Sequence, residues 1–185
     1  MNIVFCIGNG PSIKDIDLTI LKPIGPTYGC NNLIETFDVD NTVIVDKHLL
    51  IDLISKGYNK KTNIYTRDRW KNLIDVENIK FLSDPILDPK VKWDNENHWG
   101  SGTHALNLAA SHKAEIIIML GYDLYNKDLD PSCWIYQIEQ CFKKYPNIQF
   151  VQVQKNDWQC PQSWNADNFL MDDIGGLEKM LGELI

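Results

Sequence analysis

The 185-residue chain has the length of one ordinary domain, and its 44% hydrophobic and 23% charged residues are typical of a globular protein. A net charge of −7 argues against a nucleic-acid-binding protein, which needs a basic face for the phosphates. No signal peptide, no apolar run near the roughly 18 residues of a membrane span and no C-x-x-C pair are present, so we expect a cytoplasmic protein without disulfides or a zinc ribbon.

The first half of the chain alternates short apolar runs with turns and helical patterns. The apolar runs predict strands at residues 3–7, 27–30, 42–45, 63–66 and 79–82. Ser12 precedes Asp15 by three residues, which is the spacing of a capping box, so a helix is expected to begin at Ser12. Leucines and isoleucines at helical spacing over residues 49–54 predict another helix that ends at Gly57.

The second half repeats this alternation after a polar stretch, residues 83–100, which we interpret as a long loop of the kind that often forms a functional lid. The patterns predict a helix over 101–114, a strand over 115–120, a helix over 134–145, a strand over 148–153 and a helical tail interrupted by Gly175-Gly176. Strands separated by helices indicate one α/β domain over residues 1–185, Rossmann-like, with a mostly parallel sheet and helices on both faces.

The first candidate site is the loop that follows the first strand, Gly8-Asn9-Gly10-Pro11-Ser12. Its glycines let the backbone approach a ligand, and a helix beginning at Ser12 would offer unpaired N–H groups to an anion. The loop has neither the G-x-G-x-x-G spacing of dinucleotide-binding proteins nor the Lys-Ser/Thr ending of a P-loop. Its spacing alone favours a phosphate site and a plain tight turn about equally.

Two further polar residues follow the next strands. Asn31 can exchange hydrogen bonds with a base or a ribose, although an Asx turn is the commoner role of asparagine there. Asp46 can bind a ribose, a metal or a substrate, but the cap of the following helix is the favoured alternative.

A second glycine-flanked helix start lies at Ser101-Gly102-Thr103 and offers another anion site by the same physics. Asp123 and Tyr125 follow the most apolar strand, and a phenol at that place can donate to a phosphate oxygen. The alternative for the tyrosine is simple packing at the rim of the site.

Three histidines surround the second helix start. His98 and His104 are the candidates for acid–base chemistry, whereas His112 is expected at a helix end, bound to carbonyl groups. No carboxylate at a suitable spacing supports metal ligation by His98 and His104, so we expect no metal there.

The order of these segments resembles the bacterial lipooligosaccharide sialyltransferases and a wider group with the MptE-like pterin diphosphokinases. The resemblance rests on Gly8 to Ser12, Cys30-Asn31, Ser101-Gly102 and the segment Gly121-Tyr122-Asp123-Leu124-Tyr125. It implies that Gly8, Asn9, Asn31 and Ser101 contact a CMP moiety and that Tyr125 holds its phosphate. The segment over residues 134–150 also resembles short domains of phage genomes, which implies a location in the host cytosol.

The resemblance implies a small glycosyltransferase-like enzyme that binds a nucleotide-sugar, such as a CMP-sugar, without a cofactor. The catalytic histidine of those transferases has no counterpart, because no histidine follows His112. The candidate bases are therefore Asp46, His98 and His104. Two alternatives stay open: a diphosphokinase-like enzyme with Mg²⁺ held by Asp46 and Asp123, and a non-catalytic module that sequesters a nucleotide. The sequence also leaves a homo-oligomer open.

Overall fold

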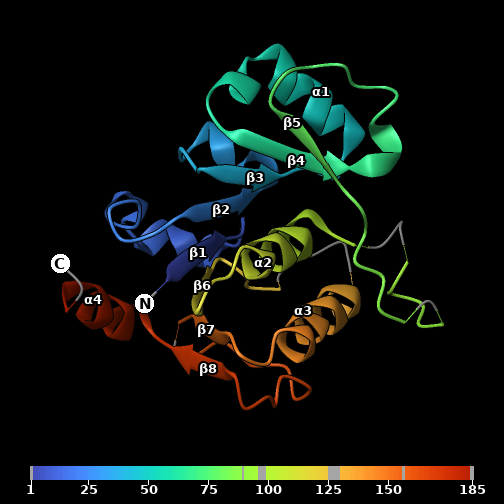
Figure 1. Ribbon diagram of the computed structural model, residues 1–185. Coiled ribbons are helices and arrows are strands. Elements are labelled where there is room, and N and C mark those ends of the chain that lie inside the picture. The colour runs from blue at the N-terminus through green and yellow to red at the C-terminus, as the bar shows by residue number, and fades with distance from the viewer. Residues whose placement is uncertain (1, 89, 96–98, 125–129, 156, 184–185) are drawn as a thin grey trace.

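A computed structural model describes residues 2–88, 90–95, 99–124, 130–155 and 157–183 (Figure 1). Its eight strands form one parallel sheet in the order β5-β4-β3-β2-β1-β6-β7-β8. The strands are β1 (Ile3–Ile7), β2 (Thr27–Cys30), β3 (Asn41–Val43), β4 (Asn63–Arg67), β5 (Ile79–Leu82), β6 (Ile116–Leu120), β7 (Gln149–Val153) and β8 (Phe169–Asp172). The α-helices are α1 (Lys47–Ser55), α2 (Ser101–Ser111), α3 (Ser132–Lys144) and α4 (Ile174–Gly182).

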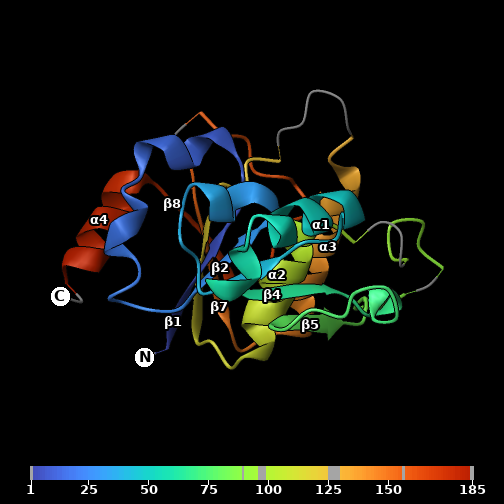
Figure 2. The ribbon, with the colours of Figure 1, turned by 90° about the horizontal axis from the view of Figure 1, so that it is seen from above.

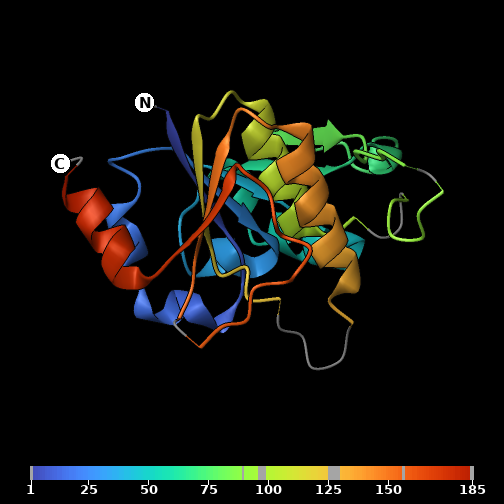
Figure 3. The ribbon, with the colours of Figure 1, turned by 90° about the horizontal axis from the view of Figure 1, so that it is seen from below.

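Both faces of the sheet are covered, as the continuous apolar character of the central strands requires. Successive side chains of a strand point to opposite faces, so Val4 and Cys6 of β1 pack with α2 and α3, while Phe5 and Ile7 pack with α1 and α4. Figures 1 and 3 show α2 and α3 side by side, across the sheet from α4. The α/β Rossmann-like fold expected from the sequence is therefore confirmed.

The strand order has a reversal at its centre. The chain runs outward from β1 to β5 and then returns through α2 to β6, which pairs with the other side of β1. In open α/β sheets, ligands bind outside the carboxyl ends of the strands at such a reversal. A ligand site is therefore expected at the loops that follow β1 and β6.

The prediction that a helix begins at Ser12 is wrong in the type of helix and in its start. Residues Pro11–Asp15 form a short 3-10 helix whose N-cap is Gly10, without a side-chain cap. Figure 2 shows this segment on the same side of the sheet as α4. Ser12 instead binds Asp123, a residue distant in sequence, so local spacing could not reveal its partner.

The predicted helical tail contains a strand that the sequence analysis missed. Residues Phe169–Asp172 form β8, the edge strand beside β7. Gly175 and Gly176 do not interrupt a helix but lie in the first turn of α4, which Asp173 caps by accepting from the Gly176 N–H at 2.8 Å. None of the described helices combines the length and the apolar composition that crossing a bilayer requires.

Candidate functional site

A cavity of about 460 Å³ opens at the carboxyl edge of the sheet, beside the reversal between β1 and β6. This volume is in the range of small-molecule sites. Nine residues singled out from the sequence line it: Gly8, Asn9, Gly10, Asn31, Asp46, Ser101, Gly102, Thr103 and Asp123. The loops after β1, β2, β3 and β6 and the start of α2 therefore converge on one space.

The N-terminus of α2 supplies free hydrogen-bond donors to this cavity. The first intrahelical bond runs from His104 N–H to Gly100 C=O. The N–H groups of Ser101, Gly102 and Thr103 donate to no group within the described residues, as is normal for the first turn of a helix. The Ser101 hydroxyl accepts from the Val45 N–H at 3.0 Å, which ties this helix start to the end of β3.

The loop after β1 differs from the expected phosphate cradle, because the N–H groups of Gly8, Gly10 and Ser12 already have partners. Gly8 N–H donates to Leu120 C=O at 2.7 Å, and Gly10 N–H donates to Gly121 C=O at 2.9 Å. Ser12 N–H donates to the Asp123 carboxylate at 2.8 Å. The expectation that a helix beginning at Ser12 offers unpaired N–H groups to an anion is therefore wrong for Ser12, and the N–H groups of Gly8 and Gly10 are engaged as well.

The glycines of this loop have a packing role instead. A Cβ atom at Gly8 would lie 2.5 Å from the Gly121 carbonyl oxygen, and one at Gly10 would lie 2.5 Å from the Asp123 carboxyl carbon. The missing side chains let the loops after β1 and β6 touch, so that both can line the cavity.

Asp123 holds these two loops together. Its carboxylate accepts hydrogen bonds from the N–H and the hydroxyl of Ser12 and from the side-chain amide of Gln154 at 2.7 Å. These three donors occupy much of its acceptor capacity, because an ionised carboxylate has about four acceptor positions. Ser12 itself does not line the cavity; it orients Asp123, which does.

Asp46 both caps a helix and faces the cavity. Its Oδ1 accepts from the Leu49 N–H at 2.8 Å, so the N-cap alternative for this residue is confirmed. Its Oδ2 has no hydrogen-bond partner among the described residues. One oxygen of the carboxylate thus keeps α1 in place while the other is available to a ligand.

Asn31 and Asn9 shape the wall beside Asp46. Asn31 has a φ of +53°, a left-handed conformation that asparagine tolerates better than most residues. The Asn9 side-chain amide donates to Cys30 C=O at 3.2 Å and joins the ends of β1 and β2. Burial raises the pKa of the Cys30 thiol to about 12, so this cysteine at the cavity wall is a neutral thiol at physiological pH.

The structure does not bring His104 into the cavity. Its side chain is 2% exposed, and its Nε2 lies 2.7 Å from Asp84 Oδ1. Arg67 Nη1 lies 3.3 Å from the same oxygen, and Arg67 Nη2 donates to Trp99 C=O at 2.6 Å. These three side chains, Arg67, Asp84 and His104, form a buried charged cluster that anchors the chain just before α2.

The other histidine and tyrosine predictions have different outcomes. His98 and Tyr125 lie outside the described residues. His112 caps the C-terminus of α2, but its ring Nδ1 lies 2.6 Å from the Tyr28 hydroxyl instead of binding carbonyl groups through its ring.

Sequence reasoning missed the apolar wall of the cavity, formed by Leu124, Trp134 and Ile138. Trp134 and Ile138 are four residues apart on α3, so they share one face of that helix. This spacing was readable from the sequence, but nothing local showed that the face would border the strand ends and not only the core.

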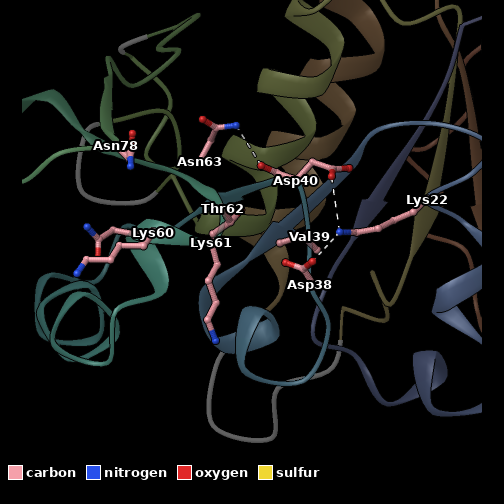
Figure 4. A pocket seen from close by; sticks show the side chains of 10 residues that line it. Lys22, Asp38, Val39, Asp40, Lys60, Lys61, Thr62, Asn63 and Asn78 are labelled. Carbon is pink, nitrogen blue, oxygen red and sulfur yellow. Dashed lines mark hydrogen bonds and ion pairs between the residues drawn. The ribbon is translucent and has the colours of Figure 1, made fainter.

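A second hollow of about 360 Å³ lies at the opposite, amino edge of the sheet. Figure 4 shows Lys22 between Asp38 and Asp40, with Lys60 and Lys61 pointing away from that pair. Lys22 Nζ lies 2.9 Å from Asp38 and 3.7 Å from Asp40. No sequence motif predicted this hollow, and it lies at the edge where α/β sheets do not usually bind ligands.

Comparison with known proteins establishes the fold class. No protein-family model matches the sequence, and no curated protein matches it. In fold the chain is similar to the MAf glycosyltransferase from Magnetospirillum magneticum AMB-1, with a TM-score of 0.54 and 14% identity, over 99% of this chain. The chain spans 37% of the length of that glycosyltransferase. The likeness is one of fold, and the resemblance to sialyltransferases stays a prediction.

Proposed function

We propose that the chain is a small glycosyltransferase-like enzyme that binds a nucleotide-sugar in the carboxyl-edge cavity. The observation that carries the proposal is the set of three free N–H groups at the start of α2, which borders the cavity beside the sheet reversal. Such a helix start favours a phosphate through its N–H groups and its dipole. The fold likeness to a glycosyltransferase supports this class of activity, and the sequence resemblance favours a CMP-sugar.

The reaction that the resemblance implies is a displacement at the anomeric carbon of the sugar. An acceptor hydroxyl attacks the anomeric carbon in line, the bond from that carbon to the phosphate oxygen breaks, and the acceptor proton passes to a base. The N–H groups of Ser101, Gly102 and Thr103 stabilise the departing phosphate. Asp46 is our candidate base, because its Oδ2 is free of partners among the described residues while His104 is buried.

The test of the base uses Asp46→Asn. Asparagine also caps helices, so the variant removes the charge while it keeps the cap of α1. Sugar-nucleotide hydrolysis should fall about 10²- to 10⁴-fold with little change in ligand affinity. Asp173→Asn makes the same change at the N-cap of α4, away from the cavity, and should leave the rate unchanged. Equal rates in wild type and Asp46→Asn would eliminate Asp46 as the base.

The test of binding itself is a thermal-shift panel of nucleotides and sugar nucleotides. A ligand that binds the folded state raises the melting temperature by mass action. A panel that leaves the melting temperature of the wild type unmoved would contradict the proposal. Tight binding of a sugar nucleotide without any turnover would favour a sequestering module.

A Mg²⁺-dependent phosphotransferase is the second candidate, because both Asp46 and Asp123 line the cavity. Carboxylate oxygens suit Mg²⁺, although those of Asp123 already accept three hydrogen bonds. Removing divalent cations with a chelator separates the two functions. Phosphoryl transfer should stop without Mg²⁺, whereas nucleotide-sugar binding and hydrolysis should continue.

A further inference from the structure

The carboxyl-edge cavity has two chemically different halves. On the side of β1, β2 and β3, its lining carries the hydrogen-bonding side chains of Asn9, Asn31 and Asp46. Trp134 and Ile138 of α3, together with Leu124 of the loop after β6, contribute apolar side chains to its lining. The start of α2, our proposed phosphate site, also lines the cavity. A ligand with one apolar, flat end and one hydroxyl-rich end matches this division.

Trp134 stands directly beside the start of α2. A Cβ atom at Gly100, the N-cap of α2, would lie 3.2 Å from Trp134 Nε1 and 3.5 Å from its Cδ1. The indole edge is therefore packed close to the backbone that precedes the three free N–H groups. The side chain is partly exposed, and its Nε1 has no hydrogen-bond partner within the described ranges.

We infer that Trp134 is the stacking platform for the nucleobase, with Leu124 and Ile138 completing an apolar base subsite. The inference rests on the proposed function and adds to it the orientation of the ligand. The base lies toward α3, the phosphate lies at the start of α2, and the transferred sugar lies toward Asn31 and Asp46. This orientation replaces the expectation that Asn31 reads the base.

The physical reason is the distribution of polar groups on the two ends of a nucleotide-sugar. A sugar ring carries hydroxyl groups around its rim, and burying them against apolar side chains loses hydrogen bonds to water. A nucleobase has two faces without such groups, and stacking on an aromatic side chain is favourable for every base. The orientation also brings the sugar to Asp46, where the proposed base must act.

The experiment is a nuclear magnetic resonance titration with cytidine 5′-monophosphate. Stacking on an indole should shift the base H5 and H6 resonances of bound nucleotide upfield, more than the ribose protons. Trp134→Leu should abolish this shift and weaken binding roughly tenfold or more, whereas Trp134→Phe should retain most of both. Tyr136→Leu is the matched control, because Tyr136 is on the same helix but does not line the cavity.

The outcomes distinguish a failure of this inference from a failure of the proposed function. If the wild type binds no nucleotide, the proposed function fails and the inference fails with it. If the wild type binds the nucleotide and Trp134→Leu binds it equally well, only the inference is overturned. Ribose protons that shift more than base protons would place a sugar on the indole and would also overturn it. Trp134→Phe keeps an aromatic ring at this position, so it tests the inference even if Trp134→Leu fails to fold. A folded Trp134→Phe protein in which the base resonances do not shift would overturn the inference.

Discussion

The two edges of the sheet carry hollows of similar size and opposite chemistry. The amino-edge hollow, about 360 Å³, has Lys22, Lys60 and Lys61 together with Asp38 and Asp40 as the charged side chains of its described lining. The carboxyl-edge cavity, about 460 Å³, has Asp46 and Asp123 as the charged side chains of its described lining. Side-chain charge alone would favour an anionic ligand at the amino edge, whereas the sheet reversal and the start of α2 favour the carboxyl edge, where we propose that it binds. Backbone donors, not lysines, mark the ligand site that we propose.

The two edges also differ in how they are held together. At the amino edge, Lys22 pairs with Asp38, and their side chains are 34% and 74% exposed. Near the carboxyl edge, Arg67 pairs with Asp84, and their side chains are 4% and 6% exposed. Exposed ion pairs contribute little to stability. Removing one member of a buried ion pair leaves the other as an unpaired buried charge, which is strongly destabilising.

The largest expected effect follows from this contrast. Asp84→Ala removes the carboxylate that faces both Arg67 and His104, and it should lower the free energy of unfolding by about 3–5 kcal/mol. Asp38→Ala removes the exposed partner of Lys22 and should cost less than about 1 kcal/mol. Urea unfolding of the two variants measures both. If both variants lost a similar free energy of unfolding, the buried cluster would contribute no more to stability than the exposed pair.

The second prediction compares two glycines that line the same cavity. Gly10→Ala places a Cβ atom 2.5 Å from Asp123 and from the Gly121 carbonyl oxygen, so it should cost about 1–3 kcal/mol of stability. Gly102→Ala meets only Tyr122 at 3.7 Å and Cys30 at 3.8 Å, which are ordinary contacts, and alanine favours the helix. Thermal unfolding should therefore separate the two. A stable Gly10→Ala protein would show that the loops after β1 and β6 need not touch.

The strands of the central sheet were predictable because their signal is local. The predicted strands match β1 to β7 within a few residues. The edge strand β8 was missed because its apolar run, Phe169-Leu170-Met171, is only three residues long and was interpreted as part of the helical tail. Its pairing comes from β7, which no local pattern reveals.

The sequence predicted where the candidate site lies, at the carboxyl ends of the strands, but not the contacts that its residues make. The carboxyl ends of parallel strands must meet at one edge, so Asn31, Asp46 and Asp123 converge as expected. What each residue does depends on partners distant in sequence. Ser12 binds Asp123, and His104 binds Asp84 inside the molecule, and neither contact follows from spacing along the chain.

The third prediction uses Gly102→Ala again, now for binding. Its methyl group would touch Tyr122 and Cys30, which both line the cavity, so it would occupy space at the proposed phosphate site. Affinity for a sugar nucleotide should fall about tenfold, or about 1.4 kcal/mol, in a fully folded protein. Isothermal titration calorimetry measures this loss. Undiminished affinity would move the phosphate away from the start of α2.

A smaller effect is expected at Asn31. Asn31→Gly keeps the φ of +53° accessible while it removes the side chain, so the fold should persist. Losing one hydrogen bond to the ligand should weaken sugar-nucleotide binding by about 1 kcal/mol, or roughly fivefold. Asn31→Ala should lose the same affinity and some stability as well, because alanine tolerates this conformation poorly. Unchanged affinity in Asn31→Gly would leave Asn31 as a turn residue.

The smallest effect is expected at the amino edge and tests the comparison most directly. Replacing Lys60 and Lys61 together by alanine removes two cations from that hollow; Lys61 otherwise lies over the Tyr58 ring at 5.2 Å. Surface changes of this kind shift stability by no more than about 0.5 kcal/mol per residue. Nucleotide affinity should stay within about twofold of wild type at both low and moderate salt, because exposed charges far from the ligand are screened. A tenfold loss that deepens as salt is lowered would place the nucleotide among the lysines, and the backbone donors of α2 would no longer mark the ligand site.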